Sequence, residues 1–131
     1  MSAMPLVSQP VPEVTESDVQ RIVCRDFAPE SWTKANEILS RYDLAESQSG
    51  GDRVRAAILK LAHGDVRALE VNVAIACVDF RDVIATAEYP QFARHSPSDN
   101  LSQSEKAALV EADWVQYNAW FHSKLRNLDD A

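Results

Sequence analysis

The sequence predicts an all-α protein, a bundle of about five helices around a buried central helix at about residues 65–89. Apolar residues recur at three- and four-residue spacing along the chain, and no segment alternates apolar and polar residues for long enough to make a convincing strand. The stretch from Gly64 to Pro90 has a marked start and stop and is apolar on nearly every side. A surface helix normally carries one apolar stripe, so we expect this helix to be buried on two sides.

Length, composition and charge narrow the class of protein. A chain of 131 residues that is 46% hydrophobic and 25% charged is typical of one soluble globular domain. Its net charge of −7 argues against nucleic acid or an anionic membrane as the main partner, since binding phosphates requires a positive field. The sequence contains no run of roughly 20 apolar residues. We therefore expect a cytoplasmic protein that does not bind membranes.

The chain divides into one domain and two tails. Residues 1–13 contain three prolines and almost no charge, which predicts a flexible tail rather than a helix. We expect a single helical domain at 14–126 and a disordered C-terminus at 127–131. The two cysteines, Cys24 and Cys77, are too few for a disulfide framework and are expected to be reduced thiols.

The first two helices have clear start signals. Thr15 is expected to cap the first, with Asp18 three residues on in a weakened capping box. Pro29 is expected to begin the second, at the position that proline tolerates best. The polar segment at 43–52 follows and is expected to be a loop, since it contains two adjacent glycines. The apolar faces of these helices comprise Val19, Ile22, Val23 and Phe27, and then Trp32, Ala35, Ile38, Leu39 and Tyr42.

A third helix is predicted at about 53–63, followed at once by the central helix. Gly64 should end the third helix in the left-handed conformation, and Asp65 should cap the fourth. Pro90 should end the fourth helix. After a loop at 91–103, Ser102 or Ser104 is expected to cap the last helix. The apolar stripe of that helix comprises Val110, Trp114, Tyr117, Phe121 and Leu125.

Four charged residues on the central helix need an explanation. They are Asp79, Arg81, Asp82 and Glu88, and they share the helix with two apolar faces. A charge in such a place is costly unless it is paired. We interpret these residues as a structural ion-pair network, with Arg53, Arg55 and Arg67 as candidate partners.

The alternative is an acidic site for a metal ion or for acid–base chemistry. No histidine shares the spacing of these acids, and the sequence has no H-E-x-x-H motif and no glycine-rich phosphate loop. We therefore predict no catalytic, metal-binding or cofactor-binding residues. A cleft formed by Arg81, Glu88 and Tyr89 remains open as a site for a small ligand or a reaction.

Two further surfaces are suggested. On the last helix, Leu109, Gln116 and Trp120 project away from the apolar stripe and are a possible interaction patch, unless this side packs inside the bundle. Basic residues also straddle the corner between the third and fourth helices, but the net charge disfavours DNA binding there. They are Arg53, Arg55, Lys60 and Arg67.

Three blocks of the sequence resemble a family of small uncharacterised bacterial proteins. They are RVRAAILKLAHGD from Arg53, CVDFRDVIATAEYP from Cys77, and ADWVQYNAWF from Ala112. The resemblance extends over about residues 30–122. It implies a helical bacterial protein of the cytosol. The family has no assigned activity, so the resemblance implies no catalytic residues.

The sequence favours a non-enzymatic helical module for protein interaction or regulation, with a protein partner or a homo-oligomer as the bound state. A toxin-neutralising immunity protein is a narrower version of this hypothesis. The alternative is a small-ligand-binding protein or enzyme that uses the Arg81, Glu88 and Tyr89 cleft.

Overall fold

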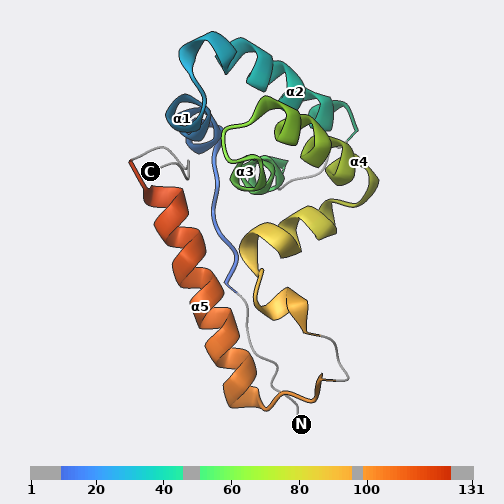
Figure 1. Cartoon of the computed structure of the whole chain (residues 1–131), viewed down its shortest axis with the longest axis vertical. Helices are drawn as coiled ribbons and strands as arrows, with labels where there is room; N and C mark the ends of the chain where they lie inside the picture. Colours follow the sequence, from blue (N-terminus) through green and yellow to red (C-terminus); the bar gives the residue numbers. More distant parts are fainter. Residues whose placement is uncertain (1–9, 46–50, 96–98, 125–131) are drawn as a thin grey trace.

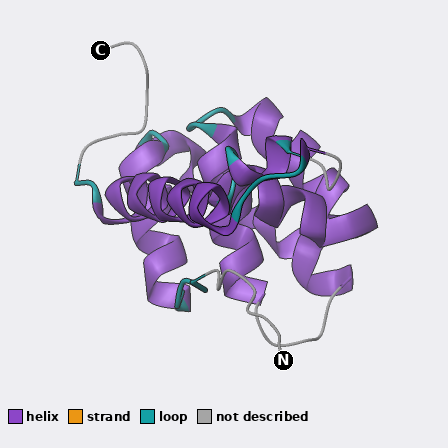
Figure 2. Cartoon of the chain, turned by 90° about the horizontal axis from the view of Figure 1, so that it is seen from below, coloured by secondary structure: helices purple, strands orange, loops and turns teal. Residues whose placement is uncertain are grey.

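Figure 1 shows the computed structural model of the chain, which describes residues 10–45, 51–95 and 99–124. It confirms an all-α bundle. The described residues contain five α-helices and two short 3₁₀-helices, and Figure 2 shows helices and loops but no strand among them. In chain order they are α1 (Glu16–Asp26), η1 (Pro29–Ser31), α2 (Trp32–Ala45), α3 (Gly51–Ala62), α4 (Val66–Glu88), η2 (Phe92–Arg94) and α5 (Gln103–His122).

Most helix starts follow the expected capping residues. The Thr15 hydroxyl accepts a hydrogen bond from the backbone N–H of Asp18, whose carboxylate accepts one from the N–H of Thr15. Ser102 and Glu105 form the same box at α5. Pro29 begins the 3₁₀-helix η1 instead of α2 itself, which starts at Trp32. The polar loop predicted at 43–52 is shorter at both ends, because α2 continues to residue 45 and α3 begins at 51.

The corner between α3 and α4 is tight. Gly64 has a φ of 76°, in the left-handed region expected of it, and His63 before it also has a positive φ, 51°. Asp65 then caps α4 by accepting a hydrogen bond from the N–H of Ala68 at 2.8 Å. The corner folds α4 back against α3.

The helix that is surrounded by the others is α3. Four consecutive residues, Ala56 to Leu59, are fully buried, and four consecutive residues cover every side of a helix. Helices α1, α2 and α4 pack around it, and Figure 1 shows it near the centre of the upper part of the molecule. The expectation that α4 would be buried on two sides is therefore wrong. Only one of its faces packs on the core, through Leu69, Val73, Ala76, Val83, Ile84 and Ala87.

The structure also divides α4 into two arms. Asp79 has extended backbone angles, φ −156° and ψ 98°, so the helix is interrupted between residues 66–78 and residues 80–88. In Figure 1 the chain reverses direction at this point, and the second arm runs back toward α5. The predicted single rod is thus two shorter helices.

Helix α5 lies along one side of the bundle, and its C-terminal end reaches α1 (Figure 1). Val110, Tyr117 and Phe121 of its predicted stripe are buried, and Trp114 is partly buried. Leu125 falls outside the described residues. So do most of the predicted N-terminal tail, at 1–9, and the predicted C-terminal tail, at 127–131.

Candidate functional site

The break in α4 is built by the Asp79 side chain. Its carboxylate oxygen Oδ1 accepts a hydrogen bond from the backbone N–H of Arg81 at 3.1 Å and another from Nε of Arg81 at 3.0 Å. A side chain that accepts a hydrogen bond from the backbone N–H two residues later is the signature of a helix N-cap. The side chain and the backbone N–H of Arg81 together hold the pKa of Asp79 below its usual value. Asp79 therefore starts the second arm of α4.

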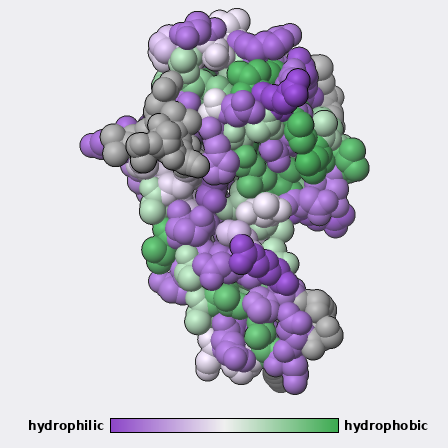
Figure 3. Space-filling view, viewed as in Figure 1, coloured by the Kyte–Doolittle hydropathy of each residue, from purple (hydrophilic) through white to green (hydrophobic). Residues whose placement is uncertain are grey.

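The first arm presents an apolar ridge to solvent. Val71 is 53% exposed, Ile75 41% and Val78 88%, and Ala74 between them is also exposed. At 100° per residue these four residues lie within about 100° of arc, on the side of the helix away from the core. We call these four residues the α4 ridge. Figure 3 shows hydrophobic residues gathered over the α4 region, at the edge of the molecule.

A hollow lies at the end of the α4 ridge, beside the break. Its volume is about 300 Å³, and its lining includes Val78 of the ridge, Tyr42 of α2 and Phe80 of the second arm. Phe80 is 40% exposed although helical periodicity places it on the core face. The interruption at Asp79 turns the second arm, so the register of the first arm no longer applies to Phe80. Val78 belongs to both the ridge and the hollow, whose lining also includes the charged residues Asp79 and Arg81.

Glu88 lies elsewhere, at the end of the second arm, where it is 3% exposed. Its two carboxylate oxygens accept hydrogen bonds from Nε and Nη2 of Arg53, at 2.8 and 2.7 Å. Nη2 also donates to the Tyr89 hydroxyl at 3.2 Å. Burial is the main cause that raises the pKa of Tyr89. This cluster fastens the end of α4 to the start of α3, and Arg53 was among the partners suggested by the sequence.

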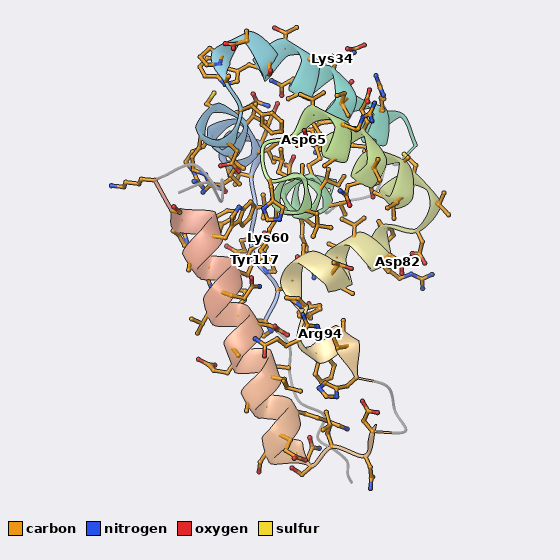
Figure 4. All side chains as sticks on the ribbon, viewed as in Figure 1. Lys34, Lys60, Asp65, Asp82, Arg94 and Tyr117 are labelled. Carbon is orange, nitrogen blue, oxygen red and sulfur yellow. The ribbon has the colours of Figure 1, made fainter. Side chains whose placement is uncertain are left out.

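The four charges predicted as one ion-pair network are therefore divided between two places. Asp79 pairs with Arg81 at the surface, and Glu88 pairs with Arg53 in the interior. Asp82 is exposed at the outer edge of the molecule, as Figure 4 shows, and its side chain has no ion-pair partner among the described residues. The prediction of a single network is wrong, because Asp79 and Arg81 lie at the start of the second arm, at the surface, whereas Glu88 lies at its end, on the side that faces the interior.

The residues of the suggested Arg81, Glu88 and Tyr89 cleft are likewise divided between the surface and the interior. The guanidinium of Arg81 is bound to Asp79 and its side chain is 80% exposed. The Glu88 carboxylate and the Tyr89 hydroxyl are bound to Arg53. Arg81 lies about 10 Å along the helix axis from Glu88, given seven residues at a rise of 1.5 Å. The structure does not bring these three side chains together.

The patch predicted on α5 is largely packed inside the bundle. Trp120 is 8% exposed, and its ring packs against Tyr117, Phe121 and the guanidinium of Arg25. Gln116 donates hydrogen bonds to the carbonyl of Asp113 at 2.9 Å and that of Ala87 at 3.4 Å. Leu109 is half-buried. These three residues form no exposed patch, because α1 and the end of α4 cover this side of α5.

Two polar groups that hold α5 in place were not anticipated from the sequence. Arg25 of α1 donates from Nη1 to the carbonyls of Trp120 and Ser123, at 2.7 and 2.9 Å, and its guanidinium also binds the buried Asp26 carboxylate. Asp113 is fully buried and accepts hydrogen bonds from the backbone N–H groups of Gln91 and Phe92, both at 3.0 Å. Both contacts join segments distant in sequence, and no local pattern indicates them.

The basic residues near the α3–α4 corner do not act as one patch. Arg53 is bound to Glu88, and Arg55 donates to Asp52 at 2.6 Å. Burial lowers the pKa of Lys60, although the nearby Asp113 raises it, and Figure 4 shows Lys60 on α3 facing the side of α5 that carries Tyr117. Arg67 is exposed and has no ion-pair partner in the described part of the chain.

Two other kinds of feature are absent from the described residues. Within residues 10–45, 51–95 and 99–124, no three His, Cys, Asp or Glu side chains are grouped as metal ligands. None of the described helices is both long and apolar enough to cross a membrane. The α4 ridge is the candidate site, because Val71, Ile75 and Val78 are three of the six exposed large apolar residues of the described chain.

Comparison with known proteins gives no relative. No protein-family model, no curated protein and no solved structure matches the chain. The resemblance to a bacterial family that the sequence blocks suggest stays a prediction.

Proposed function

We propose that this protein is a non-enzymatic interaction module that binds a helix of a protein partner through the α4 ridge. The main support for this proposal is the exposure of the ridge to solvent. Val78, at 88%, is the most exposed large apolar residue of the described chain, and its two ridge neighbours Val71 and Ile75 lie within one or two turns of it. Contiguous apolar surface of this kind marks interaction sites on soluble proteins.

The spacing of the ridge supports a helical partner. Residues at i, i+4 and i+7 are the anchors by which amphipathic helices pack against other helices or into apolar grooves. Val71, Ile75 and Val78 have this spacing. Each Å² of apolar surface that a partner removes from water contributes about 25 cal/mol of favourable free energy to binding. The opposite face of the same arm already packs on the core, so the ridge is available for a second contact.

Site-specific photo-crosslinking in the native cells tests this proposal. A photoreactive amino acid replaces Val78 in one variant and Val115 in another. Val115, on α5, is a large apolar residue 56% exposed and makes a matched control. We expect a crosslinked adduct with a protein from position 78 and none from position 115. A Val71→Asp substitution in the position-78 variant should abolish the adduct.

The proposal fails if position 78 gives no adduct, or if the adduct persists unchanged after Val71→Asp. Mass spectrometry of the adduct identifies the partner. An adduct with a toxin would support the narrower hypothesis of an immunity protein.

We further propose a cytoplasmic location, which the exposed free thiols of Cys24 and Cys77 support, because thiols persist in a reducing compartment. Cell fractionation that recovers the protein outside the cytoplasm would contradict it.

A further inference from the structure

We propose that a hollow between α1 and the C-terminal end of α5 binds a phosphate group, either free or carried by a small molecule. Its volume of about 430 Å³ lies within the usual range for small-ligand sites. Figure 1 shows the end of α5 reaching α1. We call this site the basic hollow, and it is lined by Asp18, Arg21, Arg25, His122, Ser123 and Lys124. None of these residues belongs to α4, so the site is independent of the α4 ridge.

Arg21 presents hydrogen-bond donors that no protein group uses. Its guanidinium lies over the ring of Phe121, with Cζ 5.1 Å from the ring centroid. Stacking of this kind restrains the guanidinium without occupying its N–H groups. The side chain is 40% exposed and donates no hydrogen bond within the described residues. A planar guanidinium held in this way can bind two phosphate oxygens side by side.

Asp18 is the one carboxylate of the lining, and most of its hydrogen bonding is directed elsewhere. Its Oδ2 accepts hydrogen bonds from the backbone N–H and the hydroxyl of Thr15, both at 3.0 Å. The bond from the Thr15 backbone is the main cause that lowers the pKa of Asp18. Its Oδ1 is 3.6 Å from Nη2 of Arg21, which is too long for a hydrogen bond. Asp18 therefore offsets part of the Arg21 charge but leaves the donors of Arg21 available.

Arg25 cancels the negative features beside the basic hollow. Its side chain is 6% exposed, and its Nε lies 2.7 Å from Oδ1 of Asp26. Its Nη1 donates to the carbonyls of Trp120 and Ser123. Carbonyls at a helix C-terminus carry partial negative charge, which would repel an anion. Arg25 is used up in these contacts, so we assign it no direct role in binding the ligand.

His122 and Lys124 supply further donors at the edge of the basic hollow. Both side chains are exposed. The ring of His122 packs against Phe121, with the two centroids 5.1 Å apart. Neither side chain has a hydrogen bond or an ion pair within the part of the chain that the structure describes. Three side chains with unused N–H groups therefore surround one hollow.

The charges of the basic hollow sum to a positive value in an acidic chain. Arg25 is balanced by Asp26, and Arg21 is opposed by Asp18. The ammonium of Lys124 remains, and protonation of His122 adds to it. The chain as a whole carries a net charge of −7. The basic hollow is therefore a local exception to the negative field of the protein, and an anion is the ligand that it favours.

A phosphate group fits these donors better than a carboxylate does. A phosphate ester carries close to two negative charges at neutral pH and offers three acceptor oxygens. Arg21, His122 and Lys124 supply one donor group for each oxygen. A carboxylate has two oxygens and one charge, so it would leave a donor unused. Because the donors are exposed to water, binding should be weak, in the millimolar range, and should weaken as salt increases.

Nuclear magnetic resonance of the full chain tests this proposal. Backbone amide shifts are followed while sodium phosphate, or separately glycerol phosphate, is added at neutral pH and constant ionic strength. We expect saturable shifts in α1 and at the end of α5, and none when sodium chloride alone is added. Tighter binding of glycerol phosphate assigns the site to a small organic phosphate, and equal binding assigns it to free phosphate.

Arg21→Gln and Lys124→Gln should each raise the dissociation constant several-fold. Arg41→Gln is a matched control and should bind as the wild type does. The Arg41 side chain is 45% exposed and lies 3.6 Å from a Glu70 carboxylate oxygen, which is the separation between Arg21 and Asp18. Arg21→Lys keeps the charge but loses the planar fork, so its affinity should lie between those of the wild type and Arg21→Gln.

The amide spectrum of each variant also shows whether the variant is folded. Shifts that never saturate, or that saturate outside α1 and the end of α5, would overturn the proposal. An equal loss of affinity in Arg21→Gln and Arg41→Gln would overturn it as well, because phosphate would then respond only to the overall charge of the protein.

Discussion

The carboxylate of Asp79 accepts a hydrogen bond from the backbone N–H of Arg81, and this contact starts a new helical arm in the middle of α4. The consequence extends beyond the local turn. The second arm runs back toward α5, where Glu88 binds Arg53 in the interior. The first arm packs on the core through one face and leaves the α4 ridge in solvent.

The cap at Asp79 can be tested by substitution. Asp79→Ala removes the acceptor of the Arg81 N–H, so the free energy of unfolding should fall. Asp79→Asn keeps a capping oxygen and should lie close to the wild type. Urea unfolding followed by circular dichroism measures both. If the alanine variant were as stable as the wild type, the carboxylate would have no capping role.

Glu88→Gln should destabilise the protein by about 3 kcal/mol, because it leaves the Arg53 guanidinium beside a neutral amide in a buried setting. The surface pair Lys34–Glu37 provides the control. Its side chains are 52% and 60% exposed, so Glu37→Gln should change stability by less than about 0.5 kcal/mol. Chemical unfolding of the two variants measures the difference. Equal effects would contradict the structural role of the Arg53–Glu88 pair.

Asp113→Ala should lower the unfolding free energy by about 1–3 kcal/mol, because the N–H groups of Gln91 and Phe92 lose their acceptor. Glu111 is an exposed neighbour on α5, and its replacement by alanine should change stability by no more than about 0.5 kcal/mol. Thermal unfolding compares the two. A cost for Asp113→Ala as small as that for Glu111→Ala would mean that the anchor between η2 and α5 is dispensable.

Tyr117 gives a prediction for alkaline pH. Its hydroxyl is buried with no hydrogen-bond partner, and burial is the main cause that raises its pKa far above the ordinary value of 10.0. The folded protein therefore keeps this phenol protonated while the unfolded chain ionises from about pH 10. Stability should then fall as pH rises above about 10, by up to about 1.4 kcal/mol per pH unit from this group.

The Tyr117→Phe substitution removes the contribution of Tyr117 to this loss of stability at alkaline pH. The contribution of Tyr89, whose pKa is raised in the same direction, remains. At neutral pH the variant should be as stable as the wild type or more stable by about 1 kcal/mol, because a buried hydroxyl without a partner is removed. Above pH 10 its stability should fall less steeply. Urea unfolding at several pH values measures both effects, and parallel pH profiles for the two proteins would refute the assignment.

Local signals in the sequence predicted much of the fold. Thr15, Asp65 and Ser102 cap helices as expected, because a cap depends on residues within one turn. Asp79 carries the same capping signal. Asp82 follows it by three residues, just as Asp18 follows Thr15. The continuous apolar periodicity through this region instead predicts one unbroken helix, and the structure shows a break at Asp79.

The candidate site was harder to predict because it depends on which helix lies in the centre. Ala56 and Ala57 are small, so α3 carries a weak apolar signal although every side of it is buried. The second apolar face of α4 predicts burial, whereas the structure leaves it in solvent as the α4 ridge. Trp120 was expected at the surface, yet Arg25 packs on its ring from 95 residues away. Such contacts follow from tertiary packing and have no local pattern.

Thiol accessibility at position 78 reports whether a partner covers the α4 ridge in cells. In a protein whose Cys24 and Cys77 are replaced by serine, a single cysteine is placed by Val78→Cys or by Val115→Cys. The rate of thiol modification is measured in dilute purified protein and in the native cells. A contact on the α4 ridge predicts that the rate at position 78 falls several-fold in cells relative to the rate at position 115. An unchanged ratio of the two rates would contradict the claim that the ridge is an interaction surface.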